Sequence, residues 1–422
     1  MTTERADSTS GSGRSRRIAW GVSASATSWE GAAPASDWAR WERLGLVPTS
    51  GEGNGFGTNF TDDLALLGSH DLTTLRLGID WARIEPLEGR VDGGSIEHYR
   101  RILEAAREAG VGIWACLHDQ TSPGWFGDDL GGFADERARS YHWPRHVDRV
   151  AEHLGDLVAG WVPIADPLGW ARRGHLTGAG PPGSRDPKAA LDASAGALRG
   201  VLSSWELLRG TPQPVATSFV VSPLHAAPSD DDPTTVVTAG RHRDFLDATM
   251  WDCWIRLLRD GVLALPDRPD VALPQAVDAF DVIGIGYRHG ATVDEHGSAG
   301  PYPRDRAVGP DGHVAWAEGL AHVLDRVSTD LPGRRYLIDG LGVPTSPEEA
   351  NGDERRCEFM EEAAAVVADA VRGGVQVDGL LWQSGIDGYE WRAGYDIELG
   401  LFDRDRRPRP SAALAARYAS TS

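Results

Sequence analysis

Short runs of apolar and β-branched residues recur along the chain, separated by stretches whose apolar positions repeat with helical spacing. A short, continuously apolar run bounded by turn residues is typical of a strand that is buried on both faces. Such runs occur at residues 17–26, 74–84, 110–118, 157–166, 214–224, 280–288, 334–343 and 377–385. We therefore expect eight strands.

Two of the intervening stretches have an amphipathic pattern that predicts helices. In residues 95–110 the apolar side chains share one face, Ser95 is the expected N-cap, and Gly110 is expected to end the helix. Residues 354–372 repeat in the same way and are followed by the pair Gly373-Gly374. Helices that alternate with apolar strands predict a parallel sheet, and eight such units favour an α/β fold of the (β/α)8 TIM-barrel type over an open doubly wound sheet.

Three stretches rich in proline, glycine and aspartate are predicted to be loops: residues 177–187, 227–233 and 289–315. In a (β/α)8 barrel the loops that follow strands form the active face, so polar residues at strand ends gain functional weight. Residues 1–16 are polar and are expected to form a disordered tail, which leaves residues 17–422 for a single barrel.

The composition excludes several classes of protein. A formal net charge of −20 over 422 residues argues against nucleic acid or an anionic membrane surface as a partner. The three cysteines are far apart, so a disulfide framework is not expected and a reducing compartment is favoured. The sequence has no secretion signal and no apolar run of membrane-spanning length. We expect a cytoplasmic protein, with its oligomeric state open.

One carboxylate at a strand end raises a functional question. The segment VPIADPLGW (residues 162–170) places Asp166 at the end of the fourth predicted strand, directly before a proline. Aspartate before proline is a common way to leave a strand, because its side chain bonds the backbone of the turn. The same position in a barrel lies at the mouth of the site. Both interpretations, turn residue and working acid, stay open at this point.

Three other segments resemble a known family. GVSASATSWEGA (21–32), RLGIDWARIEP (76–86) and GLLWQSGIDGYEWRAGY (379–395) are similar to the first-, second- and eighth-strand motifs of the family 1 glycoside hydrolases. The resemblance runs in order from about residue 18 to residue 415. It implies a β-glycosidase-like (β/α)8 barrel that takes a small glycoside-like substrate and uses neither an organic cofactor nor a metal.

The resemblance also implies where the catalytic carboxylates lie. The family uses two glutamates in a retaining mechanism, an acid/base in an Asn-Glu-Pro motif and a nucleophile in a Glu-Asn-Gly motif. Residues 165–167 here read Ala-Asp-Pro, so Asp166 is the acid/base candidate. Residues 337–340 read Leu-Ile-Asp-Gly. An ungapped comparison puts Asp339 in the place of the nucleophile, whereas a one-residue gap puts Ile338 there.

Most positions that contact the sugar in the family are changed as well. The family's first-strand glutamine, third-strand histidine, sixth-strand tyrosine and eighth-strand tryptophan are all replaced, whereas the second-strand arginine and the final Glu-Trp pair are kept. The resemblance therefore implies a substrate-binding set of altered specificity, which consists of Ser28, Arg76, His118, Asp119, Arg288, Gln383, Glu390 and Trp391.

The shortened carboxylates leave three interpretations. Aspartate in place of glutamate withdraws each carboxyl by about 1.5 Å, which widens the gap towards the roughly 6.5–9.5 Å of inverting enzymes. Asp166 would then be the acid and Asp339 the base. Alternatively, Asp339 pairs with Arg76 or Arg288 and the protein is an inactive pseudoglycosidase that binds sugar or serves as a scaffold. In a third interpretation, the same carboxylates and Asp119 catalyse a transfer, an isomerisation or a proton transfer, or they bind a divalent ion.

Aromatic and imidazole side chains in the loops have less specific signals. Four tryptophans in or near strand-following loops either line an aglycone cleft or pack the loops onto the barrel: Trp38, Trp41, Trp125 and Trp170. The histidines of the segment 142–153 are expected to pack or to lie on the surface rather than to bind a metal.

Overall fold

The computed structural model describes residues 17–228 and 233–421, so the predicted tail at residues 1–16 and the acidic residues 230–232 lie outside the described residues. Eight strands pair in parallel in the order β4-β3-β2-β1-β13-β12-β9-β5. Each coincides with one of the eight predicted segments to within a few residues. Their bounds are β1 Ala19–Ala24, β2 Thr74–Gly78, β3 Gly112–Cys116, β4 Gly160–Val162, β5 Phe219–Val221, β9 Ile283–Tyr287, β12 Arg335–Leu341 and β13 Gln376–Gln383.

The two end strands of this order meet along a short seam. Trp161 of β4 forms a parallel bridge with Val215, just before β5. The Trp161 N–H donates to the Pro214 carbonyl (2.9 Å), and the Ala216 N–H donates to the Trp161 carbonyl (2.8 Å). These hydrogen bonds curl the sheet into the predicted barrel.

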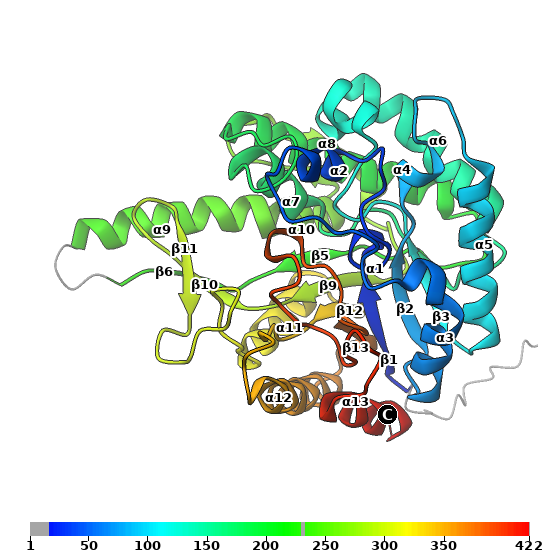
Figure 1. Cartoon of the computed structure of the whole chain (residues 1–422). Coiled ribbons are helices and arrows are strands. Elements are labelled where there is room, and N and C mark those ends of the chain that lie inside the picture. The colour runs from blue at the N-terminus through cyan, green and yellow to red at the C-terminus, as the bar shows by residue number, and fades with distance from the viewer. Residues whose placement is uncertain (1–16, 229–232, 422) are drawn as a thin grey trace, which may run out of the picture.

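A helix follows each strand and lies on the outside of the barrel, as Figure 1 shows. Such a cover on the outer face explains why the strands are apolar on both faces. None of the helices in the described part of the chain has the length and apolar character that crossing a membrane requires. In chain order the outer helices are α3 Phe56–Ser69, α5 Gly93–Glu108, α6 Glu136–Leu154, α8 Pro187–Leu208, α10 Cys253–Asp260, α11 Glu318–Asp330, α12 Gly352–Arg372 and α13 Pro410–Thr421.

The start of α5 corrects a prediction. The N-cap is Asp92 rather than Ser95, because the Asp92 carboxylate accepts hydrogen bonds from the backbone N–H groups of Gly94 and Ser95. The helix begins with two glycines, so its first turn has no apolar side chain by which the pattern could predict it. The predicted end is confirmed, since α5 stops at Glu108 and Gly110 takes a positive φ of 73°.

Shorter helices and turns occupy the segments between strands and outer helices. The helices are α1 Ala26–Glu30, α2 Asp37–Arg43, α4 Trp81–Ile84 and α7 Pro167–Ala171. The π-helical and 3₁₀ turns are η1 Trp125–Asp129, η2 Gly132–Ala134, η3 Arg172–Leu176, η4 Ala248–Asp252, η5 Pro274–Ala276 and η6 Trp391–Ala393.

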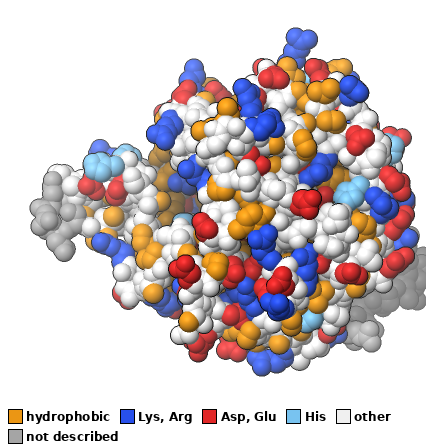
Figure 2. Space-filling view, viewed as in Figure 1, with side chains coloured by type: hydrophobic (Ala, Val, Ile, Leu, Met, Phe, Trp, Pro, Cys, Tyr) orange, Lys and Arg blue, Asp and Glu red, His pale blue; other side chains and the backbone are white. Residues whose placement is uncertain are grey.

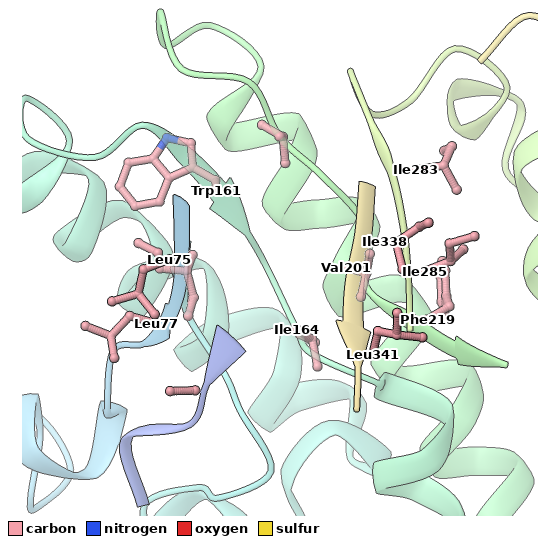
Figure 3. Close-up of a cluster of buried hydrophobic side chains, with 14 of the residues drawn as sticks. Leu75, Leu77, Trp161, Ile164, Val201, Phe219, Ile283, Ile285, Ile338 and Leu341 are labelled. Carbon is pink, nitrogen blue, oxygen red and sulfur yellow. The ribbon is translucent and has the colours of Figure 1, made fainter. Parts of the chain in front are cut away.

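Alternation along the strands decides which side chains reach the inside of the barrel. Leu75 and Leu77 of β2 are fully buried with the outer helices, as are Ile285 and Ile338 (Figure 3). A separate cluster gathers apolar residues from several strands inside the closed sheet, namely Cys116, Val162, Ala165, Ala216, Val282, Leu337 and Leu381. Two residues further along β12 and β13, the inward positions are Asp339 and Gln383.

The predicted loop at residues 289–315 is in part a sheet. β10 (Gly290–Val293) pairs with β11 (Ala299–Tyr302) and with β6 (Leu224–Ala226), and in Figure 1 these strands and α9 (Pro233–Asp247) extend away from the barrel. The turn between β10 and β11 is built around Asp294, whose carboxylate accepts from two backbone N–H groups. Because these strands are short and rich in turn residues, their sequence predicted a loop. A second, two-stranded sheet joins β7 (Val262–Leu263) and β8 (Val271–Ala272).

The surface that surrounds this framework has mixed charge. On the face shown in Figure 2, acidic and basic side chains are interspersed with apolar ones.

A buried ion pair connects the last two helices of the barrel. Arg356 of α12 is fully buried, and its Nη1 donates to Asp353 Oδ1 at 2.6 Å. The Asp353 carboxylate also accepts from the backbone N–H (2.9 Å) and the hydroxyl (2.6 Å) of Ser411, at the start of α13. Asp353 therefore joins the two helices.

We predict that Asp353→Ala lowers the free energy of unfolding by about 3–5 kcal/mol, because the buried Arg356 guanidinium loses its carboxylate and keeps the neutral oxygens of Thr345 and Glu398. The control is Asp369→Ala on the same helix, whose exposed pair with Arg372 contributes at most about 1 kcal/mol. Urea denaturation followed by circular dichroism measures both. Equal losses in the two variants would contradict the structural role of Asp353.

Candidate active site

A cavity of about 780 Å³ lies at the carboxyl ends of the barrel strands. The barrel architecture puts its active site at this end. Nine of the ten residues predicted from the sequence line this cavity, namely Ser28, Arg76, Asp119, Asp166, Arg288, Asp339, Gln383, Glu390 and Trp391.

His118 is the exception. Its side chain is buried behind the cavity wall, where Nε2 lies 3.0 Å from the Ser122 hydroxyl and the ring packs against Phe133 and Trp170. Burial lowers the pKa of His118 to about 3. A neutral, enclosed imidazole supports the wall, so at this strand end Asp119 rather than His118 faces the cavity.

Arg76 joins two of the predicted carboxylates on the cavity floor. Its Nη1 donates to Asp119 Oδ2 at 3.1 Å, and its Nε lies 3.7 Å from Asp339 Oδ2. The guanidinium is 7% exposed, and burial by itself would lower the pKa of Arg76. The two carboxylates outweigh burial and raise it, so Arg76 is a fixed positive charge.

Asp339 faces the cavity, whereas Ile338 points outward. Ile338 belongs to the apolar layer beneath the outer helices, so of the two residues only Asp339 lines the cavity. Burial raises the pKa of Asp339, and Arg76 and a hydrogen bond with Ser218 oppose this effect. The nearby carboxylates of Asp119 and Asp166 raise it further.

Asp166 is both a turn residue and a cavity residue. It takes a left-handed backbone conformation (φ 45°) and caps α7, with Oδ1 accepting from the Gly169 N–H at 3.1 Å. Its other oxygen, Oδ2, accepts from both Nη1 and Nη2 of Arg173 at 3.1 Å. A Cβ on residue 169 would overlap this carboxylate, so glycine is required there. The turn role is therefore confirmed, whereas the role of a working acid stays a prediction.

Arg173 and Gln120 are site residues that sequence reasoning missed. Arg173 lies on η3, seven residues after Asp166, and its second η-nitrogen also donates to Gln120 Oε1. The Gln120 amide in turn donates to the Ala165 carbonyl at 3.0 Å. The sequence did contain a signal for Arg173, namely a basic residue two helical turns after a capping aspartate. The family motifs do not include this position.

Arg288 and Glu390 face each other across the cavity without an ion pair. Arg288 is exposed to the cavity and forms no hydrogen bond or ion pair with any described residue. Partial desolvation by the cavity walls lowers the pKa of Arg288, and Asp166 and Glu390 oppose this effect. Burial raises the pKa of Glu390 to about 7, and Arg288 opposes this effect. Near neutral pH, Glu390 therefore exchanges a proton readily.

An aromatic cluster forms one wall beside Glu390. The Trp391 ring contacts Trp38 edge to face, with a centroid distance of 4.9 Å, and Trp38 Nε1 donates to the Tyr389 hydroxyl at 3.1 Å. Among the four loop tryptophans, Trp38 and Trp170 line the cavity. The other two pack the loops, since Trp41 stacks on Trp38 and Trp125 donates to the Glu85 carbonyl. Trp38 and Trp170 are therefore cavity residues, whereas Trp41 and Trp125 pack the loops.

Comparison with known proteins identifies the family. The family model described as glycosyl hydrolase family 1 matches residues 17–256 and 299–421. The chain belongs to glycosyl hydrolase family 1. Residues 257–298, which the model leaves out, include β9 and β10 and the position of Arg288.

Relatives of this family 1 chain are distant. It is 27% identical to the chloroplastic β-glucosidase-like protein SFR2 of Oryza sativa subsp. japonica over 407 residues, which is 89% of this chain and 57% of that protein. Among solved structures, the β-glycosidase from Pyrococcus horikoshii has a TM-score of 0.85 at 25% identity, covering 95% and 93% of the two chains. A Thermotoga maritima family 1 β-glucosidase in complex with isofagomine lactam has a TM-score of 0.83 at 20% identity, covering 96% and 97%.

The carboxylates of this family 1 site are not arranged around a metal. Within residues 17–228 and 233–421, no group of three or more His, Cys, Asp or Glu side chains is placed to hold an ion. Arg76 instead lies against Asp119 and Asp339, and Arg173 against Asp166.

We predict that Glu390 makes stability depend on pH. Because the folded-state pKa of about 7 exceeds the ordinary value of 4.5, folding takes up a proton between these limits. The stabilisation is complete below pH 4.5 and is lost as the pH rises through 7. Relative to Glu390→Gln, the wild type should lose on the order of 3 kcal/mol of unfolding free energy over this window.

Urea unfolding at a series of pH values measures this difference. Glu97→Gln, at an exposed position on α5, is the matched control and should show no such trend. A pH-independent difference between wild type and Glu390→Gln would refute the assignment.

Proposed function

We propose that this chain acts on an O-glycoside by hydrolysis or glycosyl transfer, with Asp166 and Asp339 as the catalytic carboxyl pair. The observation that carries the proposal is that both carboxyls line one cavity at the carboxyl ends of β4 and β12. Paired carboxylates are the usual catalytic equipment for cleaving a glycosidic bond. Membership of glycosyl hydrolase family 1 supports the same conclusion.

The opposite wall supplies a surface for a sugar ring. Glu390 accepts hydrogen bonds from hydroxyl groups when it is ionised, and the Trp391 ring beside it offers an apolar face to the ring carbons. Gln383 adds an amide that both donates and accepts, while Ser28 adds a hydroxyl. This set binds a polar ring in one orientation without an organic cofactor.

The proposed reaction is inverting. The two aspartates are each one methylene shorter than glutamate, which leaves room for a water molecule between the carboxyl of Asp339 and the anomeric carbon. Asp339, oriented by Arg76 and Ser218, takes the proton from this water. Asp166 donates a proton to the departing oxygen. To do so it must first be released from Arg173, whose side chain is 44% exposed and has room to move.

A second function, sugar binding without turnover, is favoured by one observation. The Asp166 carboxylate is engaged by Arg173 and by the Gly169 N–H, so both of its oxygens already have partners within the protein. In this case Asp166 is a structural cap of α7, and the cavity holds a glycoside without cleaving it.

We predict that the wild type cleaves at least one of a panel of aryl β-glycosides and releases the inverted anomer. Asp166→Asn and Asp339→Asn should each lower kcat by about 10²- to 10⁴-fold, because each removes a proton-transfer group. The measurements are chromophore release and an NMR assay of the first-formed anomer. Asp62→Asn, exposed on α3, is the control and should leave kcat unchanged. Net retention would exclude the inverting mechanism.

Absence of turnover by the wild type on the whole panel, combined with glycoside binding in calorimetry, would replace the first function with the second.

We further predict that Arg173→Met increases kcat, because the Asp166 carboxyl loses its two hydrogen bonds to Arg173 and is free to approach the departing oxygen. Steady-state kinetics on the cleaved glycoside measure this change. Arg185→Met, in the loop before α8, removes a charge without a contact to Asp166 and is the control. An unchanged kcat in Arg173→Met would show that release of Asp166 from Arg173 does not limit turnover.

A further inference from the structure

A side recess adjoins the active-site cavity and lies between three loops. It has a volume of about 160 Å³. Its walls come from the segments 309–315 before α11, 342–344 after β12 and 393–399 after β13. Several residues line both the recess and the main cavity, among them Arg288, Gln383 and Glu390. These shared residues form the opening between the two spaces.

The inner wall of the recess, formed by the residues that do not line the main cavity, is largely apolar. Apart from two glycines, its side chains are those of Val314, Ala315, Val343, Pro344, Leu399 and Arg355. The one charged group, Arg355 of α12, is already engaged. Its Nη2 donates to the Pro344 carbonyl at 2.9 Å and to Glu349 Oε2 at 3.0 Å. Glu349 therefore balances the charge of this guanidinium.

Backbone groups of the inner wall also have partners within the protein. The Gly309 N–H donates to the His313 carbonyl at 2.6 Å. The Leu399 carbonyl accepts from the Ser384 N–H and from Trp382 Nε1, both at 3.2 Å. A ligand group in the recess consequently finds apolar surface there rather than free hydrogen-bonding groups.

The volume of the recess limits what it can hold. An apolar cavity of roughly 150 Å³ binds one benzene molecule, so the recess has room for a ring or a branched chain of about six carbon atoms. A second sugar ring would have to give up hydrogen bonds to water that this wall does not replace. The recess therefore favours an apolar group over one that is rich in hydroxyls.

We propose that the sugar bound in the main cavity carries a small apolar acyl group, and that the side recess binds this group. The recess opens beside Glu390 and Gln383, which the proposed function assigns to hydroxyls of the ring. An ester on one of these hydroxyls directs its acyl group through the opening. Arg288, at the same opening, is available to donate to the ester carbonyl.

This inference rests on the proposed function only in that Glu390 and Gln383 hold the sugar. Ala315, on the inner wall, is then a specificity-determining residue.

The test is calorimetric titration of the full-length protein, which needs no turnover. Methyl β-D-glucopyranoside is compared with its monobenzoates at the 3-, 4- and 6-hydroxyls. At least one monobenzoate should bind about 10- to 100-fold more tightly than the parent glycoside, because its ring leaves water for an apolar pocket. The acetate at the same hydroxyl should gain less, since it buries less apolar surface. The gallate, whose ring adds three hydroxyls, should lose the gain.

Ala315→Leu fills the recess and should remove most of the gain of the monobenzoate, while the affinity for the parent glycoside stays unchanged. Ala179→Leu makes the same change at a position that lines the main cavity but not the recess, and it should leave the ratio of the two affinities unchanged. The wild-type series of benzoate, acetate and gallate stands even where a variant does not fold.

Three outcomes overturn the inference. The first is that no monobenzoate binds more tightly than the parent glycoside. The second is that the gallate keeps the full gain, because the pocket would then not be apolar. The third is that Ala315→Leu keeps it, because the acyl group would then bind elsewhere, such as at the aromatic wall beside Trp391.

These outcomes are separate from those for the proposed function. Tighter binding of an acylated sugar without cleavage of any glycoside would support this inference while removing the catalytic role of Asp166 and Asp339. Cleavage of unsubstituted glycosides without a gain from the acyl group would do the reverse.

Discussion

The ion pairs of Arg76 are the interaction on which the arrangement of the cavity floor depends. A guanidinium on the inner face of β2 is costly unless carboxylates accompany it. Asp119, just after β3, and Asp339, on β12, supply them from strand ends on both sides of β2 in the sheet order. The orientation of Asp339, the proposed base, is therefore coupled to the charge of Arg76. Substitution of Arg76 leaves two buried carboxylates without this partner, whereas substitution of either aspartate leaves Arg76 with the other.

A second constraint acts on Asp166. Its backbone conformation, its capping of α7 and its contact with Arg173 all hold the carboxylate in one place. This positions the group at the cavity wall and at the same time occupies both of its oxygens. Release of Arg173 is consequently the step that separates a catalytic site from a binding site.

Much of the fold could be predicted from the sequence because its signals are local. All eight strand segments, and the end of α5 at Gly110, follow from runs of apolar residues and from glycine. The errors were local too. The glycines at the start of α5 gave no helical signal, so the cap is Asp92 rather than the predicted Ser95. The short strands β10 and β11 have the composition of a loop. The resemblance located nine cavity residues but not Arg173, since no motif of the family contains it.

The sequence by itself determined which residues stand at strand ends, because the two-residue period of a strand and the parallel order of a barrel bring those ends together. It left Asp339 and Ile338 undecided, since a comparison of letters does not show which face a side chain takes. The tertiary structure decided which of the two side chains faces the cavity, and it decided which charges are paired. Arg76 meets Asp339 across 263 positions because the first strand pairs with the last, which places β2 and β12 in one curved sheet. Ion pairing depends on distance in space, and no periodic pattern in the chain records it.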